Sequence, residues 1–316
     1  MSPSGPSLVS IALCTYNGEA FLPQQLDSLL AQDHPALELV AFDDASSDAT
    51  WSVLQAYAPR FAHARLHRNP SNVGLSANFE QALRACRGEW IAPCDQDDVW
   101  QAHKLSRLLA ATDEATTLVY ADSMVVDEDG RPMDRSGRGA RLSDRYRMVS
   151  GADPRMFALS NCVSGHAALV RRSVVERALP IPPGAYHDWW LAFVAANLGT
   201  LAYVPETLVA FRQHRRNASG FAGQLKQQAA RSTRDKFDGE CRNLASLASF
   251  PGPHQPFFQQ LLALWRGRAD RYWCPALVRL LYRHRDLVFA MKTSPRGSKG
   301  RHALKYLVGL RGRLST

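Results

Sequence analysis

Three aspartates fall within four residues after a short apolar run. The run is Glu89-Trp-Ile-Ala-Pro93, and the acidic segment is Asp95-Gln-Asp-Asp98. Like charges packed this closely are costly unless a cation shares the site. Mg²⁺ and Mn²⁺ take oxygen ligands and keep waters or phosphates in their shell, so one or two carboxylates plus a diphosphate would suit them. The alternative is a solvated helix N-terminus, where the helix dipole stabilises aspartate.

A second acidic pair follows an earlier apolar run. Asp43 and Asp44 come directly after Leu37–Phe42. One of the two carboxylates could accept a hydrogen bond from the imide N–H of uracil or thymine, a contact that rejects bases lacking this donor. The segment from Thr15 to Glu19 follows the first apolar run and offers hydroxyl, amide and carboxylate groups for the same nucleoside.

Strand and helix periodicities alternate through the first hundred residues. Short apolar runs typical of buried strands are separated by segments whose apolar residues have helical spacing. The predicted strands are 8–14, 37–42, 64–67 and 89–93, and the predicted helices are 19–32, 47–57 and 77–86. This alternation predicts an α/β fold with a mostly parallel sheet wound by right-handed crossovers. Ligands of such sheets bind beyond the carboxyl ends of the strands, where the polar clusters fall.

The following part of the predicted core is less regular. Leu118–Val126 is predicted as a strand pair with a turn at 127–130, and residues 131–155, rich in Arg, Gly and Ser, as a long mobile loop. Three further elements complete the core: a strand at 166–170, a helix at 187–197 and strands around 201–211. Beyond Arg215 the pattern changes to helices with basic faces. We therefore predict a domain of residues 1–221 and a helical basic extension of residues 222–316.

The positive charge of the chain belongs to its C-terminal part. Trp265–Thr316 carries 13 Lys/Arg and 2 Asp/Glu, a net charge of +11, whereas the whole chain is +9. Pro275–Met291, followed by further lysines and arginines, would suit a basic amphipathic helix on an anionic membrane surface. The alternative is a solvated helical face whose apolar side packs on the core. Nucleic acid is not an expected partner, because no recognition motif accompanies the charge.

Cysteine spacing and hydropathy indicate in which cellular compartment the protein is expected. The six cysteines are scattered singly, which in a chain of 316 residues predicts reduced thiols. Residues 1–14 lack the regions of a secretory signal, and the longest apolar run, 189–204, is interrupted and falls short of a membrane span. We expect a cytoplasmic protein, peripheral at the inner face of the membrane if the basic tail binds lipid.

Several short motifs occur in the order and spacing of one enzyme family. They are Cys14-Thr-Tyr-Asn-Gly18, Asp43-Asp-Ala-Ser-Ser-Asp48, Asn72-Val-Gly74, Gly88-Glu-Trp-Ile91 and Cys94-Asp-Gln-Asp-Asp-Val-Trp100. Over about residues 7–221 the chain resembles the family-2 inverting glycosyltransferases, which have the Rossmann-like GT-A fold. Later motifs look most like the bacterial rhamnosyltransferase branch: Ser164-Gly165, His187-Asp-Trp-Trp190 and Arg212-Gln-His-Arg-Arg-Asn217.

The resemblance implies roles for individual residues. Asp97 would bind the metal ion directly, and Asp95 would contact the ribose or a metal-bound water. His214 would be a second metal ligand, with Arg212 on the phosphates; the alternative for His214 is a packed or exposed histidine. The residues implied to hold the nucleotide sugar are Thr15, Tyr16, Asn17, Glu19, Asp43, Asp44, Asn72, Asp95, Asp97 and Arg212.

Asp188 matches the position of the general base, which in this family is often the second residue of a Glu-Asp pair. Here the pair is His187-Asp188, so the residue before the base departs from the pattern while the carboxylate is retained. A hydroxyl is a poor nucleophile, so a carboxylate must take its proton. The neighbouring Trp189 and Trp190 would raise the proton affinity of Asp188 by excluding water. The alternative is a helix-capping aspartate, and we expect at least one tryptophan in the core.

The resemblance also implies the substrates. The donor would be dTDP-rhamnose, with UDP-hexoses as the alternative, and the acceptor a glycan or lipid-linked glycan. A nucleotidyltransferase is disfavoured, because residues 14–24 hold one glycine and no lysine or arginine. A catalytically silent sugar-nucleotide-binding scaffold is disfavoured by the intact Asp95, Asp97 and Asp188. The chain also lacks the Gln-x-x-Arg-Trp motif of processive synthases.

Overall fold

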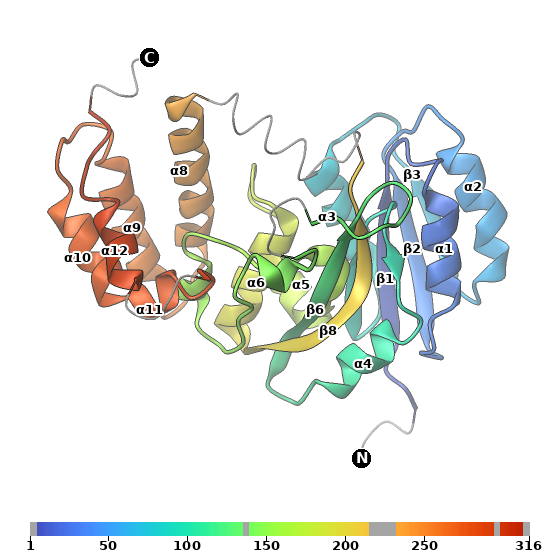
Figure 1. The fold of residues 1–316 in the computed structure, drawn as a ribbon. Coiled ribbons are helices and arrows are strands. Elements are labelled where there is room, and N and C mark those ends of the chain that lie inside the picture. Colours follow the sequence, from blue (N-terminus) through green and yellow to red (C-terminus); the bar gives the residue numbers. More distant parts are fainter. Residues whose placement is uncertain (1–4, 135–138, 215–231, 294–297, 312–316) are drawn as a thin grey trace.

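A mixed eight-stranded sheet forms the centre of the molecule (Figure 1). The computed structural model describes residues 5–134, 139–214, 232–293 and 298–311. The strand order is β3-β2-β1-β4-β7-β6-β8-β5. The strands are β1 (Val9–Thr15), β2 (Leu37–Asp43), β3 (Ala64–Arg68), β4 (Trp90–Cys94), β5 (Val99–Trp100), β6 (Thr116–Val126), β7 (Ala168–Arg171) and β8 (Thr200–Arg212).

The first four strands are parallel, as predicted. β1 pairs with β2 from Val9↔Leu37 to Thr15↔Asp43, and β4 pairs along the other side of β1. Every residue of β1 is buried, because helices cover both faces of the sheet. Alternate β1 side chains accordingly enter two different core clusters. The shared register brings the polar segments that follow β1, β2 and β4 to one edge of the sheet.

Helices cover the sheet in two layers. α1 (Leu22–Leu30), α2 (Thr50–Tyr57) and α4 (Lys104–Ala110) contribute to the core cluster on one face. α3 (Leu75–Ala85), α5 (Arg172–Ala178) and α6 (His187–Leu198) contribute to the cluster on the other face. α1 begins three residues later than predicted. Residues 18–22 form a turn at its start, in which the carbonyl of Gly18 accepts hydrogen bonds from the N–H groups of Phe21 and Leu22 at 3.1 and 3.0 Å.

The region after α4 differs from the prediction. Residues 116–126 form one long strand, β6, which runs parallel to β8 instead of folding into a strand pair. Beyond the turn at 127–130, isolated bridges join Val126 to Pro132 and Met124 to Arg141. The described part of 131–155 is irregular but anchored: the hydroxyl of Tyr120 donates to the carbonyl of Val149 at 2.8 Å, and Val149 is buried.

The C-terminal extension packs on the core through apolar side chains. It comprises α8 (Thr233–Ser249), α9 (Gln255–Arg266), α10 (Pro275–Arg283), α11 (Arg285–Val288) and α12 (Lys299–Leu304). The ring of Phe193 on α6 meets Phe250 and Phe258 edge-on, with centroids 5.9 and 5.1 Å apart. On α10, Leu277, Leu280 and Leu281 are buried in the same core cluster, so the apolar side of this helix packs inward. Figure 1 shows the helices of the extension beside α6 at one end of the molecule. The predicted domain boundary near residue 222 lies outside the described residues.

Two predictions on the whole chain can be compared with the structure. All six cysteines are free thiols, and five of them are buried. Within the part of the chain that the structure describes, no helix has the length and apolarity that a bilayer span requires.

Candidate active site

The acidic turn lies directly after the buried strand β4. Asp97 and Asp98 are buried and Asp95 is half-buried. Oδ2 of Asp97 lies 2.8 Å from Nε2 of His214, which follows the end of β8. Adjacent ligands of an octahedral ion with bonds of about 2.1 Å are about 3 Å apart, so this oxygen and nitrogen fit two neighbouring positions around Mg²⁺ or Mn²⁺. The structure thus brings together the two residues predicted as metal ligands.

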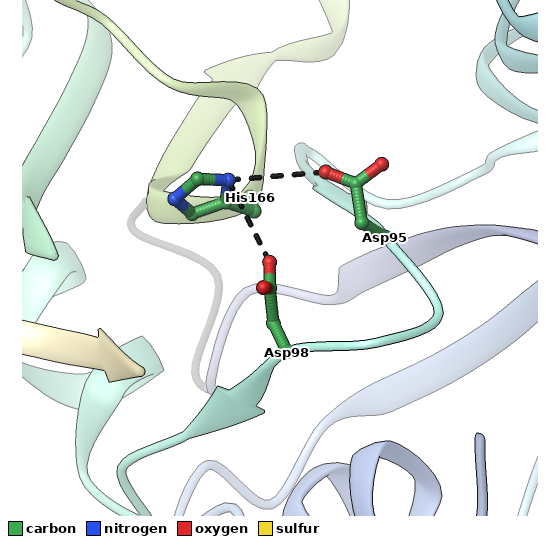
Figure 2. Close-up of side chains that lie close together, drawn as sticks. All are labelled: Asp95, Asp98 and His166. Carbon is green, nitrogen blue, oxygen red and sulfur yellow. Dashed lines mark ion pairs between the residues drawn. The ribbon is translucent and has the colours of Figure 1, made fainter. Parts of the chain in front are cut away.

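Asp98 and His166 form a second, deeper group with Asp95. Figure 2 shows the imidazole of His166 facing both carboxylates, with Nδ1 at 3.6 Å from Asp98 and 3.8 Å from Asp95. These three side chains also place oxygen and nitrogen atoms within 4.8 Å of one another, as a cation site requires. Among the described residues, Oδ2 of Asp98 has no hydrogen-bond partner although it is buried.

The electrostatics of this group follow from its burial. Burial raises the pKa of Asp98 to about 8. Burial also disfavours a charged imidazole, but the carboxylates of Asp98 and Asp95 outweigh it and raise the pKa of His166 above its usual value. One proton held by either Asp98 or His166 keeps the charge of this buried group low. This pair therefore acts as a neutralised support for the turn that carries Asp95 and Asp97.

Lys104 supplies a buried hydrogen-bond donor beneath the turn. Its side chain is fully buried at the start of α4, and Nζ donates to the carbonyl of His166 at 2.5 Å. Nζ also lies 3.0 Å from the ring centroid of Trp100. Burial lowers the pKa of Lys104 well below its usual value, and the nearby carboxylates oppose that shift. Lys104 thereby holds the segment of His166 against the acidic turn.

The residues after β1 and β2 are joined by hydrogen bonds. Oγ1 of Thr15 donates to Asp43 at 3.0 Å, and Asp43 is fully buried. Oδ1 of Asn17 accepts from the N–H of Ser47 at 2.8 Å, and Oε2 of Glu19 accepts from the N–H of Ala49 at 2.8 Å. These side chains hold the loop after β2 beside the loop after β1. Their predicted contacts with a nucleoside remain predictions.

Asp44 fixes the neighbouring loop. Its carboxylate accepts from the N–H groups of Val73 and Gly74, at 2.8 and 2.9 Å, and from the side chain of Asn69 at 2.9 Å. Asn72 lies on the same loop and is exposed at the sheet edge. Asp44 therefore fixes the loop around Asn72 through the backbone that follows it and the side chain of Asn69 that precedes it.

Asp44→Asn is expected to lower the free energy of unfolding by about 2 kcal/mol, because an amide cannot accept from all three donors and hydrogen bonds to a charged group are the stronger kind. Urea unfolding followed by circular dichroism measures this change. Asp129→Asn, on the exposed turn, is the matched control and should change stability by less than about 0.5 kcal/mol. Equal stability of the two variants would show that Asp44 does not hold the loop.

Tyr16 links the first loop to the acidic turn. Its backbone N–H donates to the side chain of Gln96 at 2.8 Å, and the amide of Gln96 donates to the Tyr16 carbonyl at 3.0 Å. A Cβ at Gly18 would lie 2.1 Å from Oε1 of Gln96, so only glycine permits this approach. The ring of Tyr16 is 49% exposed, which leaves it available to a ligand.

A cavity of about 210 Å³ joins the acidic turn to the N-terminus of α6. Asp95, His166 and Asp188 all line it. Burial raises the pKa of Asp188 above its usual value, as a general base requires. A Cβ at Gly165 would lie 3.1 Å from His187 and 3.6 Å from Asp188, so the glycine of the Ser164-Gly165 motif lets this segment pass close to both residues.

The two tryptophans after Asp188 belong to the core. The indole N–H of Trp189 donates to the carbonyl of Phe157 at 2.8 Å, and that of Trp190 donates to the carbonyl of Ala178 at 2.7 Å. This confirms the expectation that at least one is a core residue. His187 stacks on Phe79 with ring centroids 3.9 Å apart. The residue that departs from the Glu-Asp pattern is therefore held in the core by aromatic packing.

Comparison with known proteins settles the family. The model of glycosyl transferase family 2 matches residues 10–179, more than half of the chain. The chain belongs to glycosyl transferase family 2. Rv1520, an uncharacterised protein of Mycobacterium tuberculosis, is 32% identical over 213 residues, which cover 65% of this chain and 59% of the relative. The chain thus spans less than two thirds of the length of this relative.

Solved structures share the fold of this family 2 glycosyltransferase. TarS of S. aureus, in complex with UDP-GlcNAc, matches 89% of this chain and 81% of its own, with a TM-score of 0.60 and 16% identity. The mannosyltransferase PcManGT of Pyrobaculum calidifontis, in complex with GDP-Man and Mn²⁺, matches 96% of this chain and 75% of its own, with a TM-score of 0.54 and 19% identity. The predicted GT-A fold is confirmed.

Arg212 of the glycosyltransferase has a buried guanidinium directed at protein groups. Nε donates to the carbonyl of Asp97 at 2.9 Å, and Nη2 donates to Oε1 of Gln24 at 2.7 Å. Its backbone N–H donates to Asp98 at 3.0 Å. In this arrangement Arg212 positions the acidic turn, and its contact with a phosphate remains a prediction.

Sequence reasoning missed three residues of this glycosyltransferase site: Asp98, His166 and Lys104. Asp98 belongs to the acidic segment that was singled out, but no sequence feature distinguished it from Asp97. One sequence feature could have indicated Lys104: it lies on the same side of α4 as the buried Leu105 and Leu108. A lysine on the apolar side of a short helix indicates a buried positive charge that needs acidic neighbours.

Proposed function

We propose that this glycosyltransferase moves a hexosyl group from a nucleotide-diphosphate donor to a hydroxyl of a cell-surface polysaccharide precursor, with inversion at the anomeric carbon. One observation carries the proposal: Asp188 and Asp95 line the same cavity, although they are far apart in the chain. A base on one wall and the acidic turn on the other suit an acceptor hydroxyl and a departing diphosphate.

The proposed reaction uses Asp188 as the general base. The acceptor oxygen attacks the anomeric carbon from the face opposite the diphosphate, and its proton passes to the carboxylate of Asp188. The bond between the anomeric carbon and the phosphate oxygen breaks, and its electron pair stays on the diphosphate. Mg²⁺ or Mn²⁺, held by Asp97 and His214, would neutralise the charge that develops there. Asp95 would orient the ribose or a metal-bound water.

The donor is proposed to be dTDP-rhamnose, with a UDP-hexose as the alternative. The rhamnosyltransferase-like motifs around Ser164, His187 and Arg212 support the first. The acceptor is proposed to be a glycan or lipid-linked glycan, reached at the inner face of the membrane. Thr15, Tyr16 and Asp44 would hold a pyrimidine nucleoside at the edge of β1 and β2.

A donor-hydrolysis screen tests this proposal. Purified protein with Mn²⁺ is incubated with dTDP-, UDP- and GDP-sugars, and release of the nucleoside diphosphate is measured. We expect turnover with dTDP-rhamnose, and with UDP-hexoses if the alternative holds. Turnover of GDP-sugars alone would contradict the pyrimidine assignment of Asp44. Binding of a donor without any turnover would favour the silent scaffold.

The rate of transfer should depend on pH through Asp188. Because burial raises its pKa above the ordinary value of 3.8, the carboxylate takes up a proton at a higher pH than an exposed aspartate. Only the ionised form accepts the acceptor's proton, so kcat should fall as the pH falls through this pKa. Transfer assays across the pH range in which circular dichroism stays constant measure the effect. A kcat that rises on acidification would contradict the assignment of a base.

A further inference from the structure

Large apolar side chains are exposed on the outer side of the C-terminal extension. Trp273 is 64% exposed, Tyr282 52%, Leu304 55% and Val308 43%. They belong to α10, α12 and the segments that flank them. In Figure 1 these helices lie at the end of the molecule opposite α1 and α2. We call these four side chains the apolar face.

Backbone and packing contacts group the residues of the apolar face in two pairs, Trp273 with Val308 and Tyr282 with Leu304. Trp273 and Val308 are partners in an isolated antiparallel bridge, so their side chains leave the same side of the backbone pair. Tyr282 lies against α12, because a Cβ at Gly300 would be 3.0 Å from its ring. Leu304 follows Gly300 by one helical turn and therefore lies on the same side of α12.

Basic side chains surround the apolar face. Arg279 is exposed on α10 one helical turn before Tyr282, and the exposed Arg283 follows Tyr282 directly in the sequence. Arg301 and Lys305 are exposed next to Leu304. The two acidic residues after Trp265 are Asp270 and Asp286, and Asp286 is paired with Lys299 at 3.4 Å. The surface therefore combines tryptophan, tyrosine and aliphatic groups with an excess of cations.

We propose that the apolar face binds the surface of an anionic lipid bilayer. Tryptophan and tyrosine favour the headgroup level of a bilayer, and flanking cations attract anionic lipid. A second copy of the chain fits less well, because a symmetric contact would bring the same arginines together. A nucleic acid would leave Leu304 and Val308 against phosphates. The proposal rests on the proposed function, because binding would bring the cavity of Asp188 to lipid-linked acceptors.

Co-sedimentation with vesicles tests the proposal on the full chain. The protein should sediment with vesicles of phosphatidylcholine mixed with phosphatidylglycerol, and much less with phosphatidylcholine alone. Trp273→Ala and Leu304→Ala should each weaken the partition coefficient by about threefold to tenfold, because each removes an inserted apolar group. The double variant Arg279→Gln, Arg283→Gln should weaken binding and reduce its dependence on salt. Leu198→Ala, which removes a leucine that is 42% exposed on α6, is the matched control and should bind as the wild type.

Three results would overturn the proposal. The first is no sedimentation with the anionic vesicles, and the second is undiminished sedimentation of both apolar variants. The third is a wild-type dimer in solution that Trp273→Ala dissociates, which would show that a second copy covers the face. Donor hydrolysis without vesicles should be the same in every variant, because none of these residues lines the cavity. Failure of lipid binding with intact hydrolysis would leave the proposed function standing.

Discussion

Asp188→Asn is expected to lower the rate of sugar transfer by about three to four orders of magnitude while donor affinity changes little. The amide has nearly the shape of the carboxylate but cannot take the acceptor's proton. The carboxylate lines the same cavity as Asp95, and its backbone neighbour Trp189 donates to it at 2.7 Å, so its position is fixed by the start of α6. Transfer kinetics and titration of the donor by calorimetry separate the two effects.

Stability provides the control for this variant. Because the folded-state pKa of Asp188 is raised, folding free energy is lost as the pH rises above the ordinary value of 3.8, and the loss is complete above the folded-state pKa. The variant lacks this cost and should be at least as stable as the wild type at neutral pH. Glu176→Gln, on the exposed side of α5, is a matched surface substitution. Near-normal transfer by Asp188→Asn would remove Asp188 from the mechanism, whereas unfolding would show that its role is structural.

Asp97→Asn should lower donor turnover by about two to three orders of magnitude and weaken Mn²⁺ binding in the presence of nucleoside diphosphate. An amide oxygen is a weaker ligand than a carboxylate for a hard divalent cation, and Asp97 is one of only two protein ligands proposed. The effect of His214→Gln should have the same direction and be smaller, because Gln can retain an oxygen ligand.

Paramagnetic titration with Mn²⁺ measures the binding, and donor hydrolysis measures the turnover. Asp129→Asn is the control, since it removes an exposed carboxylate from the turn at 127–130. If Asp97→Asn bound Mn²⁺ with wild-type affinity, the cation site would have to be reassigned to the other candidate group, Asp95, Asp98 and His166. That outcome would keep a metal-dependent enzyme but change which residues hold the ion.

The strands and helices of the N-terminal half could be predicted from the sequence because each is specified by the pattern of apolar residues within its own segment. The run Val9–Thr15 is apolar throughout, as a strand buried on both faces must be, and the segment around Leu26 has helical spacing. The polar residues at the ends of β1, β2 and β4 meet at one edge because parallel strands share direction. Thr15 and Asp43 were thus predicted as neighbours and are joined by a hydrogen bond.

The second half depends on contacts between distant segments. The apolar run 118–126 looks the same whether it folds on itself or pairs with β8, and only the partner strand decides. The predicted helix at Glu19–Gln32 was too long at its start, where residues 19–21 form a turn before the helix. The loop 131–155 is anchored by Tyr120, whose buried hydroxyl no sequence pattern foretells.

The site residues named from the sequence are those that lie in family motifs. Asp97 and His214 are far apart in the chain, and their 2.8 Å contact follows from β4 and β8 ending at one side of the sheet. His166 and Lys104 escaped prediction because their roles come from burial: a lysine inside the core and a histidine between two carboxylates look ordinary in sequence. Burial of single charged groups is decided by tertiary packing.

The most direct test of the account is donor turnover in excess chelator. Purified protein is freed of metal with EDTA, and hydrolysis of the preferred donor is measured before and after Mn²⁺ is restored. We expect turnover to fall to background in EDTA and to return with Mn²⁺ in the wild type but not in Asp97→Asn. Equal turnover with and without chelator would contradict it, because the acidic turn after β4 would then have no cation to hold.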